Sequence, residues 1–211
     1  MQKILRIDSS SRVTGSQSRE LGDYFETKWK AARPDGQLVR RDLAKEPIEQ
    51  IRQDTITGFY TPADGMTAEL KTATALSDKL IGEVQAADTL LITAPIYNFG
   101  VPASLKAWID QVVRIGHTFS FDGANFGGLA KPDTVIVCAA HGASGYEEGG
   151  PFRAANFLEP YLDFLLKFLG VSTVRFIAVQ ATTADSATAD AGMVRAKADI
   201  DDLIASVAAS R

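Results

Sequence analysis

The alternation of longer helical stretches with five short strand-like runs, several of them apolar throughout, limits most strongly how this chain can fold. One of them, Thr-Leu-Leu-Ile-Thr-Ala at 89–94, has no polar face, which is typical of a strand covered on both sides. Strands that alternate with helices form parallel sheets through right-handed crossovers. We therefore predict an α/β fold with a doubly wound, five-stranded parallel sheet and helices on both faces. The expected strands lie at 3–8, 37–42, 89–94, 134–139 and 173–180.

The stretches between the runs predict the helices that cover this sheet. In the first of them Leu21, Phe25 and Trp29 recur at i, i+4 and i+8 and form one buried stripe. The segment 43–66, with two prolines and two glycines, is the least defined part of the chain. Since there is no repeat and no linker, we expect a single domain over residues 1–211. The later helices are expected at 67–86, 102–114, 152–169 and about 188–208.

Composition excludes several classes of protein. The net charge of −4 and the pI near 5.2 argue against a nucleic-acid partner, because sequence-blind binders need a basic face. No apolar run is long enough to cross a bilayer and no signal peptide is recognisable, so we expect a cytoplasmic protein without a membrane partner. Cys138 is the single cysteine and lies in an apolar run, which predicts a buried thiol and no metal site.

Ligands of doubly wound sheets bind beyond the carboxyl ends of the strands, so three loops become candidates: 9–17, 95–101 and 140–151. The first is rich in hydroxyl groups and leads into a helix, whose free N–H groups and dipole favour an anion. It matches neither the dinucleotide-binding glycine pattern nor a P-loop. The alternatives are a phosphate site, or a loop in which Ser16 merely caps the helix and the other serines are solvated.

The second loop places two aromatic residues, two prolines and an amide between a buried strand and a helix. The prolines fix the backbone, and Tyr97 and Phe99 can form the wall of a slot for a flat ring. The alternative is a hydrophobic loop that packs on its own sheet.

These loops resemble those of the FMN-dependent NAD(P)H azoreductases, which belong with the flavodoxin-like quinone reductases. The resemblance covers essentially the whole chain, and its most specific part is Pro95-Ile96-Tyr97-Asn98-Phe99, followed by Leu105-Lys106. It implies that isoalloxazine lies along Pro95 to Phe99, with the backbone of Asn98 or Phe99 near N5. It also implies that the FMN phosphate is held by Ser9, Ser16, Gln17 and Ser18, and that the pyrimidine side meets Ala140, His141 and Gly142. The chain departs from the family at His141, where glycine is common, and in a longer segment at 143–150.

The activity that the resemblance implies is an FMN-dependent NAD(P)H oxidoreductase reducing azo compounds and quinones. Hydride passes from NADH or NADPH to flavin N5 and then to the acceptor in two ping-pong steps, so we expect no catalytic side chain. The resemblance further implies a homodimer, with Phe121 and Phe164 lining the substrate pocket. For Phe164 the alternative is an ordinary core position, because its helix is crowded with apolar residues.

Other functions remain possible on the same scaffold. A flavodoxin-type electron carrier would share the fold and FMN but not turn over nicotinamide, and a non-catalytic binding module would retain no FMN. The aromatic segment 117–126 and the apolar helix at 152–169 favour an enclosed substrate pocket and therefore an enzyme. The sequence argues against a serine hydrolase, because Tyr146 stands where the G-x-S-x-G motif requires glycine.

Overall fold

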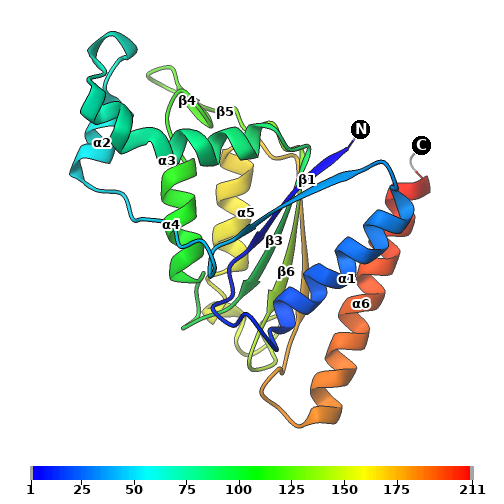
Figure 1. Cartoon of the computed structure of the whole chain (residues 1–211). Helices are drawn as coiled ribbons and strands as arrows, with labels where there is room; N and C mark the ends of the chain where they lie inside the picture. The colour runs from blue at the N-terminus through cyan, green and yellow to red at the C-terminus, as the bar shows by residue number, and fades with distance from the viewer. Residues whose placement is uncertain (1, 210–211) are drawn as a thin grey trace.

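A computed structural model describes residues 2–209 and contains one five-stranded parallel sheet (Figure 1). The strand order is β2-β1-β3-β6-β7. Successive strands are therefore added first on one side of β1 and then on the other, and the reversal in strand order lies between β1 and β3. This is the doubly wound order of flavodoxin-like sheets, and the predicted fold class is confirmed. The strands are β1 (Lys3–Asp8), β2 (Gln37–Asp42), β3 (Thr89–Pro95), β6 (Thr134–Ala140) and β7 (Thr173–Val179).

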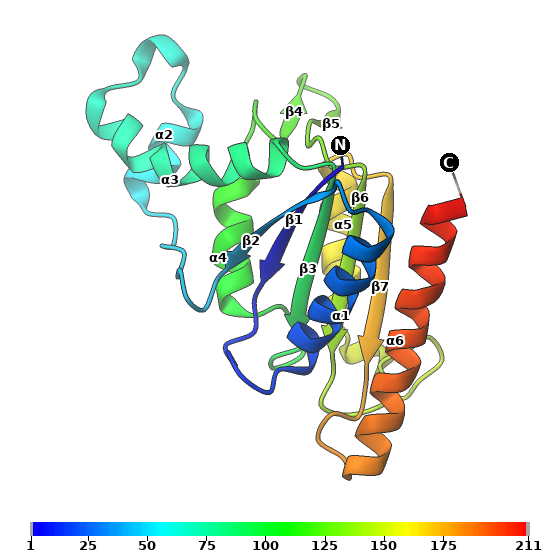
Figure 2. The ribbon, with the colours of Figure 1, turned by 45° about the vertical axis from the view of Figure 1, so that its right-hand side comes forward.

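Helices cover both faces of the sheet, as Figures 1 and 2 show. Each face has its own core because side chains alternate along the strands. Leu90 and Ile92 face one cluster, whereas Leu91 faces the other together with Leu21, Phe25 and Trp29 of α1. The first face is covered by α3 (Ala68–Gln85), α4 (Ala103–Val112) and α5 (Glu159–Phe168), and the second by α1 (Gln17–Ala32) and α6 (Ser186–Ala209).

The predicted helix at 152–169 is wrong over its first third. Residues 153–155 form a single 3-10 turn (η2), and α5 begins only at Glu159. The reason is Pro160, whose ring would collide with the carbonyl group of Asn156 in a continuous helix. Instead, the Asn156 side chain accepts a hydrogen bond from the backbone N–H of Glu159 at 3.1 Å and so marks the start of the helix.

Two regions carry elements that the apolar periodicity did not predict. Within 43–66 the chain forms α2 (Gln53–Tyr60) and a 3-10 turn, η1 (Ala63–Gly65), which project beyond the sheet in Figure 1. Between α4 and β6 it forms an antiparallel hairpin, β4 (Phe119–Phe121) and β5 (Phe126–Gly128). The Phe119 ring packs 5.0 Å from the ring of Phe168, so the hairpin lies at the carboxyl end of α5.

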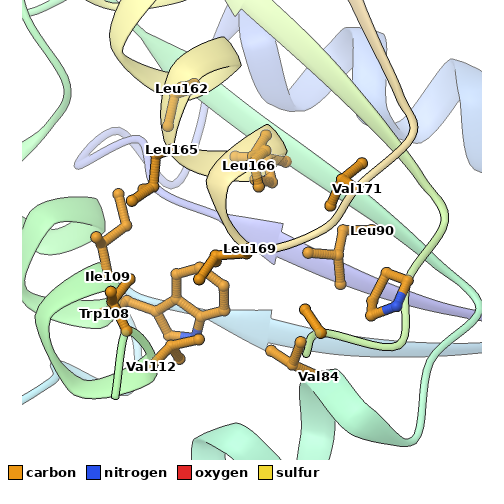
Figure 3. A pocket seen from close by; sticks show the side chains of 14 residues that line it. Val84, Leu90, Trp108, Ile109, Val112, Leu162, Leu165, Leu166, Leu169 and Val171 are labelled. Atoms are coloured by element: carbon orange, nitrogen blue, oxygen red, sulfur yellow. The ribbon is translucent and has the colours of Figure 1, made fainter. Parts of the chain in front are cut away.

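A small cavity of about 20 Å³ lies in the core beneath α4 and α5 (Figure 3). Its lining is apolar except for the indole N–H of Trp108, which has no hydrogen-bond partner among the described residues. A buried water needs two or more polar partners, so the gap stays dry. The walls include Val84, Leu90, Trp108, Ile109, Val112, Leu162, Leu165, Leu166, Leu169 and Val171.

The described part of the chain contains no helix that is both long and apolar enough to span a membrane. Across residues 2–209, no three His, Cys, Asp or Glu side chains gather in a way that could hold a metal ion. Cys138 is fully buried, and burial raises the pKa of its thiol to about 12.

Candidate functional site

A pocket of about 290 Å³ opens at the carboxyl ends of β1, β3, β6 and β7, on both sides of the reversal in strand order. We call it the strand-end pocket. Four loops that are distant in sequence build it, which is where a doubly wound sheet is expected to hold its ligand. It is lined by Ser10, Arg12, Gly15, Ser16, Gln17, Pro95, Ile96, Tyr97, Ala140, Gly142, Thr182 and Thr183.

The serines after β1 are part of the folded structure. Ser9 and Ser10 are buried, and the Ser9 hydroxyl donates to the carbonyl oxygen of Thr93 at 2.7 Å, which ties β1 to β3. The Ser10 hydroxyl lies 3.4 Å from that of Tyr97 and lines the pocket, although the sequence reasoning did not select it. A loop of solvated serines is therefore wrong for these two residues, and binding of phosphate by Ser9 stays a prediction.

The start of α1 forms one end of the pocket. The Ser16 hydroxyl caps the helix by accepting the backbone N–H of Arg19 at 3.4 Å, and it lies 3.3 Å from the hydroxyl of buried Ser18. Ser16 and Gln17 line the pocket, whereas Ser18 lies behind them. First-turn N–H groups have no partner within a helix, and the dipole is positive there. Capping and anion binding are thus compatible in this loop.

A buried ion network holds this loop in place. The Arg19 guanidinium donates to both carboxylate oxygens of Asp42, at 2.7 and 2.8 Å, and to the carbonyl oxygen of Ser10 at 2.8 Å. The hydrogen bonds from Arg19 hold the pKa of Asp42 at about 2. Beneath it, Arg6 pairs with Asp8 at 3.0 Å, and both side chains are buried. The backbone of the loop is therefore anchored from within.

The loop after β3 contains a tight turn with two consecutive left-handed residues, Asn98 at φ 47° and Phe99 at φ 71°. Tyr97 and Gly100 exchange two backbone hydrogen bonds of 3.1 Å across it. Tyr97 is 37% exposed and Phe99 is 51% exposed, so the loop does not simply pack on its own sheet. Pro95 is the last residue of β3.

Pro95, Ile96 and Tyr97 line the pocket, whereas Asn98 lines a neighbouring open groove of about 830 Å³ that shares Tyr97 with it. The backbone N–H of Ile96 donates to the carbonyl oxygen of Ala140 at 2.9 Å, so the second and third loops are joined. Both spaces are therefore bounded by one rigid segment.

In the third loop, Ala140 and Gly142 line the pocket and the His141 side chain does not. Strand alternation turns His141 toward α5, where it is 1% exposed, with its ring 4.9 Å from that of Tyr146 and Nε2 3.6 Å from the Glu159 carboxylate. Burial lowers the pKa of His141 to about 4, and neither ring nitrogen has a hydrogen-bond partner within residues 2–209. Its backbone is also engaged within the protein, because the N–H of His141 donates to the carbonyl oxygen of Val179 at 2.9 Å and its carbonyl oxygen accepts from the N–H of Thr182 at 3.1 Å. Binding of a ligand by His141 therefore stays a prediction.

The sequence reasoning missed a fourth loop, after β7. The backbone N–H of Thr182 donates to the carbonyl oxygen of His141 at 3.1 Å, and the Thr183 hydroxyl donates to that of Gly142 at 2.8 Å. Both threonines line the pocket. The usable signal is strand order, because the loop after β7 must lie next to the loop after β6.

Phe121 and Phe164 lie away from the strand-end pocket of the same chain. Phe121 stacks on Phe126 at 4.6 Å, and Phe164 lies 6.5 Å from Phe168. Phe164 is 71% exposed, so the core position considered for it is wrong. Phe121, Phe126, Phe164 and Phe168 form what we call the aromatic face.

These residues fit a flavin mononucleotide. At the start of α1, amide and hydroxyl donors surround a space suited to a phosphate, and Gly15 turns the chain there with φ 66° and open space beside it. Across the pocket, the rigid segment 95–97 and Ala140 offer flat apolar surfaces and backbone groups to a ring. Such a combination of an anion site and a slot for a ring suits a phosphorylated aromatic cofactor.

Comparisons with known proteins agree with this geometry. A family model described as a flavodoxin-like fold matches residues 2–204. An FMN-dependent NADH:quinone oxidoreductase from Xanthobacter autotrophicus is 54% identical over 170 residues, which cover 81% of this chain and 82% of the relative. A protein of the same name from Nostoc punctiforme is 36% identical over 205 residues, covering 97% of this chain and 99% of the relative.

Solved structures match in fold. An azoreductase from Bacillus anthracis superimposes with a TM-score of 0.87 at 24% identity, covering 97% of this chain and 99% of the other. An FMN-dependent NADH-azoreductase from the same species, in complex with FMN, gives a TM-score of 0.86 at 20% identity and covers 98% and 100% of the two chains. The resemblance predicted from the loops is confirmed for fold and family.

Proposed function

This chain belongs to the family of FMN-dependent NADH:quinone oxidoreductases, with its flavodoxin-like fold, and we propose that it reduces quinones with NADH by means of bound FMN. The observation that carries the proposal is the strand-end pocket. It joins an anion site at the start of α1 to the rigid slot at 95–97, at the reversal in strand order. The 54% identity to a relative of that name supports the same activity.

When bound, FMN would supply the redox chemistry, a two-step (ping-pong) transfer of hydride from NADH to the acceptor through flavin N5. The protein would bind the cofactor and orient it. Ser16, Gln17 and the first turn of α1 would hold the phosphate, and the segment 95–97 would support the ring. Backbone groups near Gly142 would lie at the pyrimidine edge, where donors would stabilise the negative charge of the reduced form.

We also propose azo compounds as acceptors and NADPH as an alternative donor. The open groove beside Tyr97 supports a broad choice of flat acceptors, since Phe157 and Tyr161 line it together with Tyr97. Flat aromatic molecules gain stacking contacts from such walls without needing specific hydrogen bonds.

A homodimer is the proposed working state. The aromatic face exposes Phe121, Phe126 and Phe164 by 45%, 61% and 71%, which is unusual for a surface left in water. Phe121 lies at the carboxyl end of α5. Phe157 lies just before α5, and its backbone N–H donates to the carbonyl oxygen of Phe99 at 3.0 Å, beside the pocket. The ten-residue helix between them is about 15 Å long. We therefore propose that Phe121 lines the substrate pocket of the second subunit, and this separation from the pocket of its own chain supports the proposal.

The remaining proposals concern organisation. Residues 1–211 act as a single domain, since both cores lie against one sheet. The cytoplasm is the proposed location, because it supplies NADH and keeps a thiol such as that of Cys138 reduced.

A visible spectrum of the purified protein, followed by anaerobic addition of NADH, tests the proposed activity. We expect a yellow protein whose flavin absorbance is lost with NADH and returns on adding a quinone. Bound flavin that NADH cannot reduce would instead indicate a one-electron carrier of the flavodoxin type. A colourless protein that binds no added FMN would contradict the assignment of the strand-end pocket.

A further inference from the structure

Arg12 is the only cation that lines the strand-end pocket among the described residues. It lies in the exposed part of the loop after β1, between buried Ser10 and the start of α1. Its backbone N–H donates to the Ser10 hydroxyl at 3.2 Å, so the main chain at this position is held while the side chain extends from it.

The other charges near this loop are already paired. Arg19 is committed to Asp42 at 2.7 Å, and Arg6 to Asp8 at 3.0 Å. Arg12 has no carboxylate partner within the part of the chain that the structure describes. One guanidinium is therefore free at the end of the pocket that the helix dipole makes favourable for an anion.

A phosphate monoester carries a charge of about −1.5 to −2 near neutral pH and presents three acceptor oxygens. Hydroxyl groups such as that of Ser16, helix amides and a half-charge from the dipole satisfy the oxygens but leave most of this charge uncompensated. A guanidinium can bond two phosphate oxygens at once and supplies a full positive charge. Arg12 is the residue that completes this end of the pocket.

We propose that Arg12 closes over the cofactor phosphate and makes the strand-end pocket select FMN over riboflavin. This inference rests on the proposed function, because it requires a flavin in the pocket. It assigns selectivity for the phosphorylated cofactor to an exposed charge on the loop, and leaves orientation of the ring to the segment 95–97.

Equilibrium binding to the flavin-free protein tests the proposal. FMN and riboflavin are titrated separately, and quenching of their fluorescence gives each Kd for wild type, Arg12→Gln, Arg12→Lys and Lys71→Gln. The last variant removes the same charge from an exposed position on α3, outside the pocket. Because Arg12 is exposed, its variants should keep the wild-type Tm, which is measured alongside.

We expect Arg12→Gln to raise the Kd for FMN about tenfold, as for loss of an exposed charge-assisted hydrogen bond, and to leave riboflavin within about twofold. Arg12→Lys should recover part of the affinity, and Lys71→Gln should match wild type. Added salt should weaken FMN binding more in wild type than in Arg12→Gln. An unchanged ratio of the two Kd values in Arg12→Gln would overturn the proposal.

NADH also carries phosphates, so a second measurement separates the two sources. With FMN saturating, the KM for NADH should be the same in wild type and Arg12→Gln. If Arg12→Gln raised the KM for NADH and left the Kd for FMN unchanged, Arg12 would bind the phosphates of NADH instead, and the proposal would be overturned. Wild type that binds neither flavin would instead contradict the proposed function itself.

Discussion

Asn98 and Phe99 are consecutive left-handed residues, with φ of 47° and 71°, and the hydrogen bonds between Tyr97 and Gly100 close the turn around them. Asparagine tolerates this conformation, but phenylalanine does so at a cost of roughly 1–2 kcal/mol. Strain of this kind persists where the surrounding structure requires it, here beside the pocket.

The strain at Phe99 can be measured by comparing two variants that both lack the ring. We expect Phe99→Gly to be more stable than Phe99→Ala by about 1 kcal/mol, because only alanine keeps the Cβ that opposes a positive φ. Chemical denaturation of both proteins gives the difference in free energy of unfolding. Equal stabilities, or a more stable alanine variant, would show that the turn is not strained.

Burial of His141 predicts a stability that depends on pH. Its pKa falls from an ordinary 6.5 to about 4 in the fold, so between these values only the unfolded chain binds the proton. The stabilising contribution is complete above pH 6.5 and is lost as the pH falls through about 4. From pH 7 to pH 5 this loss is about 2 kcal/mol.

His141→Phe, which keeps a ring against Tyr146, should remove that part of the pH dependence. Urea unfolding at pH 7 and pH 5 measures it, with His117→Gln as the control because burial also lowers the pKa of His117. Glu159 and Glu147 face the same imidazole and are retained in every variant. If the free energy of unfolding of His141→Phe changed between pH 7 and pH 5 as much as that of wild type, the pH dependence could not be assigned to His141.

Arg6 should be far more important to stability than Arg40, although both pair with Glu26 and Asp23. Arg6 is 1% exposed and also pairs with Asp8, which would be left buried without it. We expect Arg6→Met to cost about 3–5 kcal/mol and Arg40→Met, on a half-exposed side chain, at most about 1 kcal/mol. Urea unfolding of both variants decides whether the difference exists.

The cavity beneath α4 and α5 predicts a large penalty for truncation there. Leu166 is 3% exposed and lines the cavity, so Leu166→Ala enlarges a space that the walls already fail to close. The expected loss is about 4 kcal/mol, toward the upper end for such changes. Leu165→Ala, on a half-buried neighbour, should cost less, and the Kd for FMN should change in neither variant.

The fold could be predicted because its signals are local. β3 and β6 are apolar runs and α1 carries the stripe of Leu21, Phe25 and Trp29, so these signals do not depend on distant residues. The hairpin β4–β5 is too short for such a pattern and is held by contacts of Phe119 with Phe168. The late start of α5 was readable at Pro160, but the apolar pattern concealed it.

The candidate site was predicted less completely, because side-chain direction depends on neighbouring strands. The Ser9 hydroxyl bonds inward to Thr93 on β3, and the His141 side chain faces α5 while Ala140 and Gly142 face the pocket. Because side chains alternate along β6, the sequence could have indicated that His141 points away from Ala140 and Gly142. The contribution of 182–183 required knowing that β7 lies beside β6.

The four loops of the strand-end pocket are synthesised at different times, so the pocket is completed late in translation. The proposed phosphate site lies near the beginning of the chain, but the threonines that donate hydrogen bonds to the third loop follow β7, the last strand to be synthesised. A nascent chain on the ribosome thus lacks one wall of its pocket until residue 183 has emerged. If the pocket holds the cofactor as proposed, its full binding energy becomes available to the fold only at the end of translation.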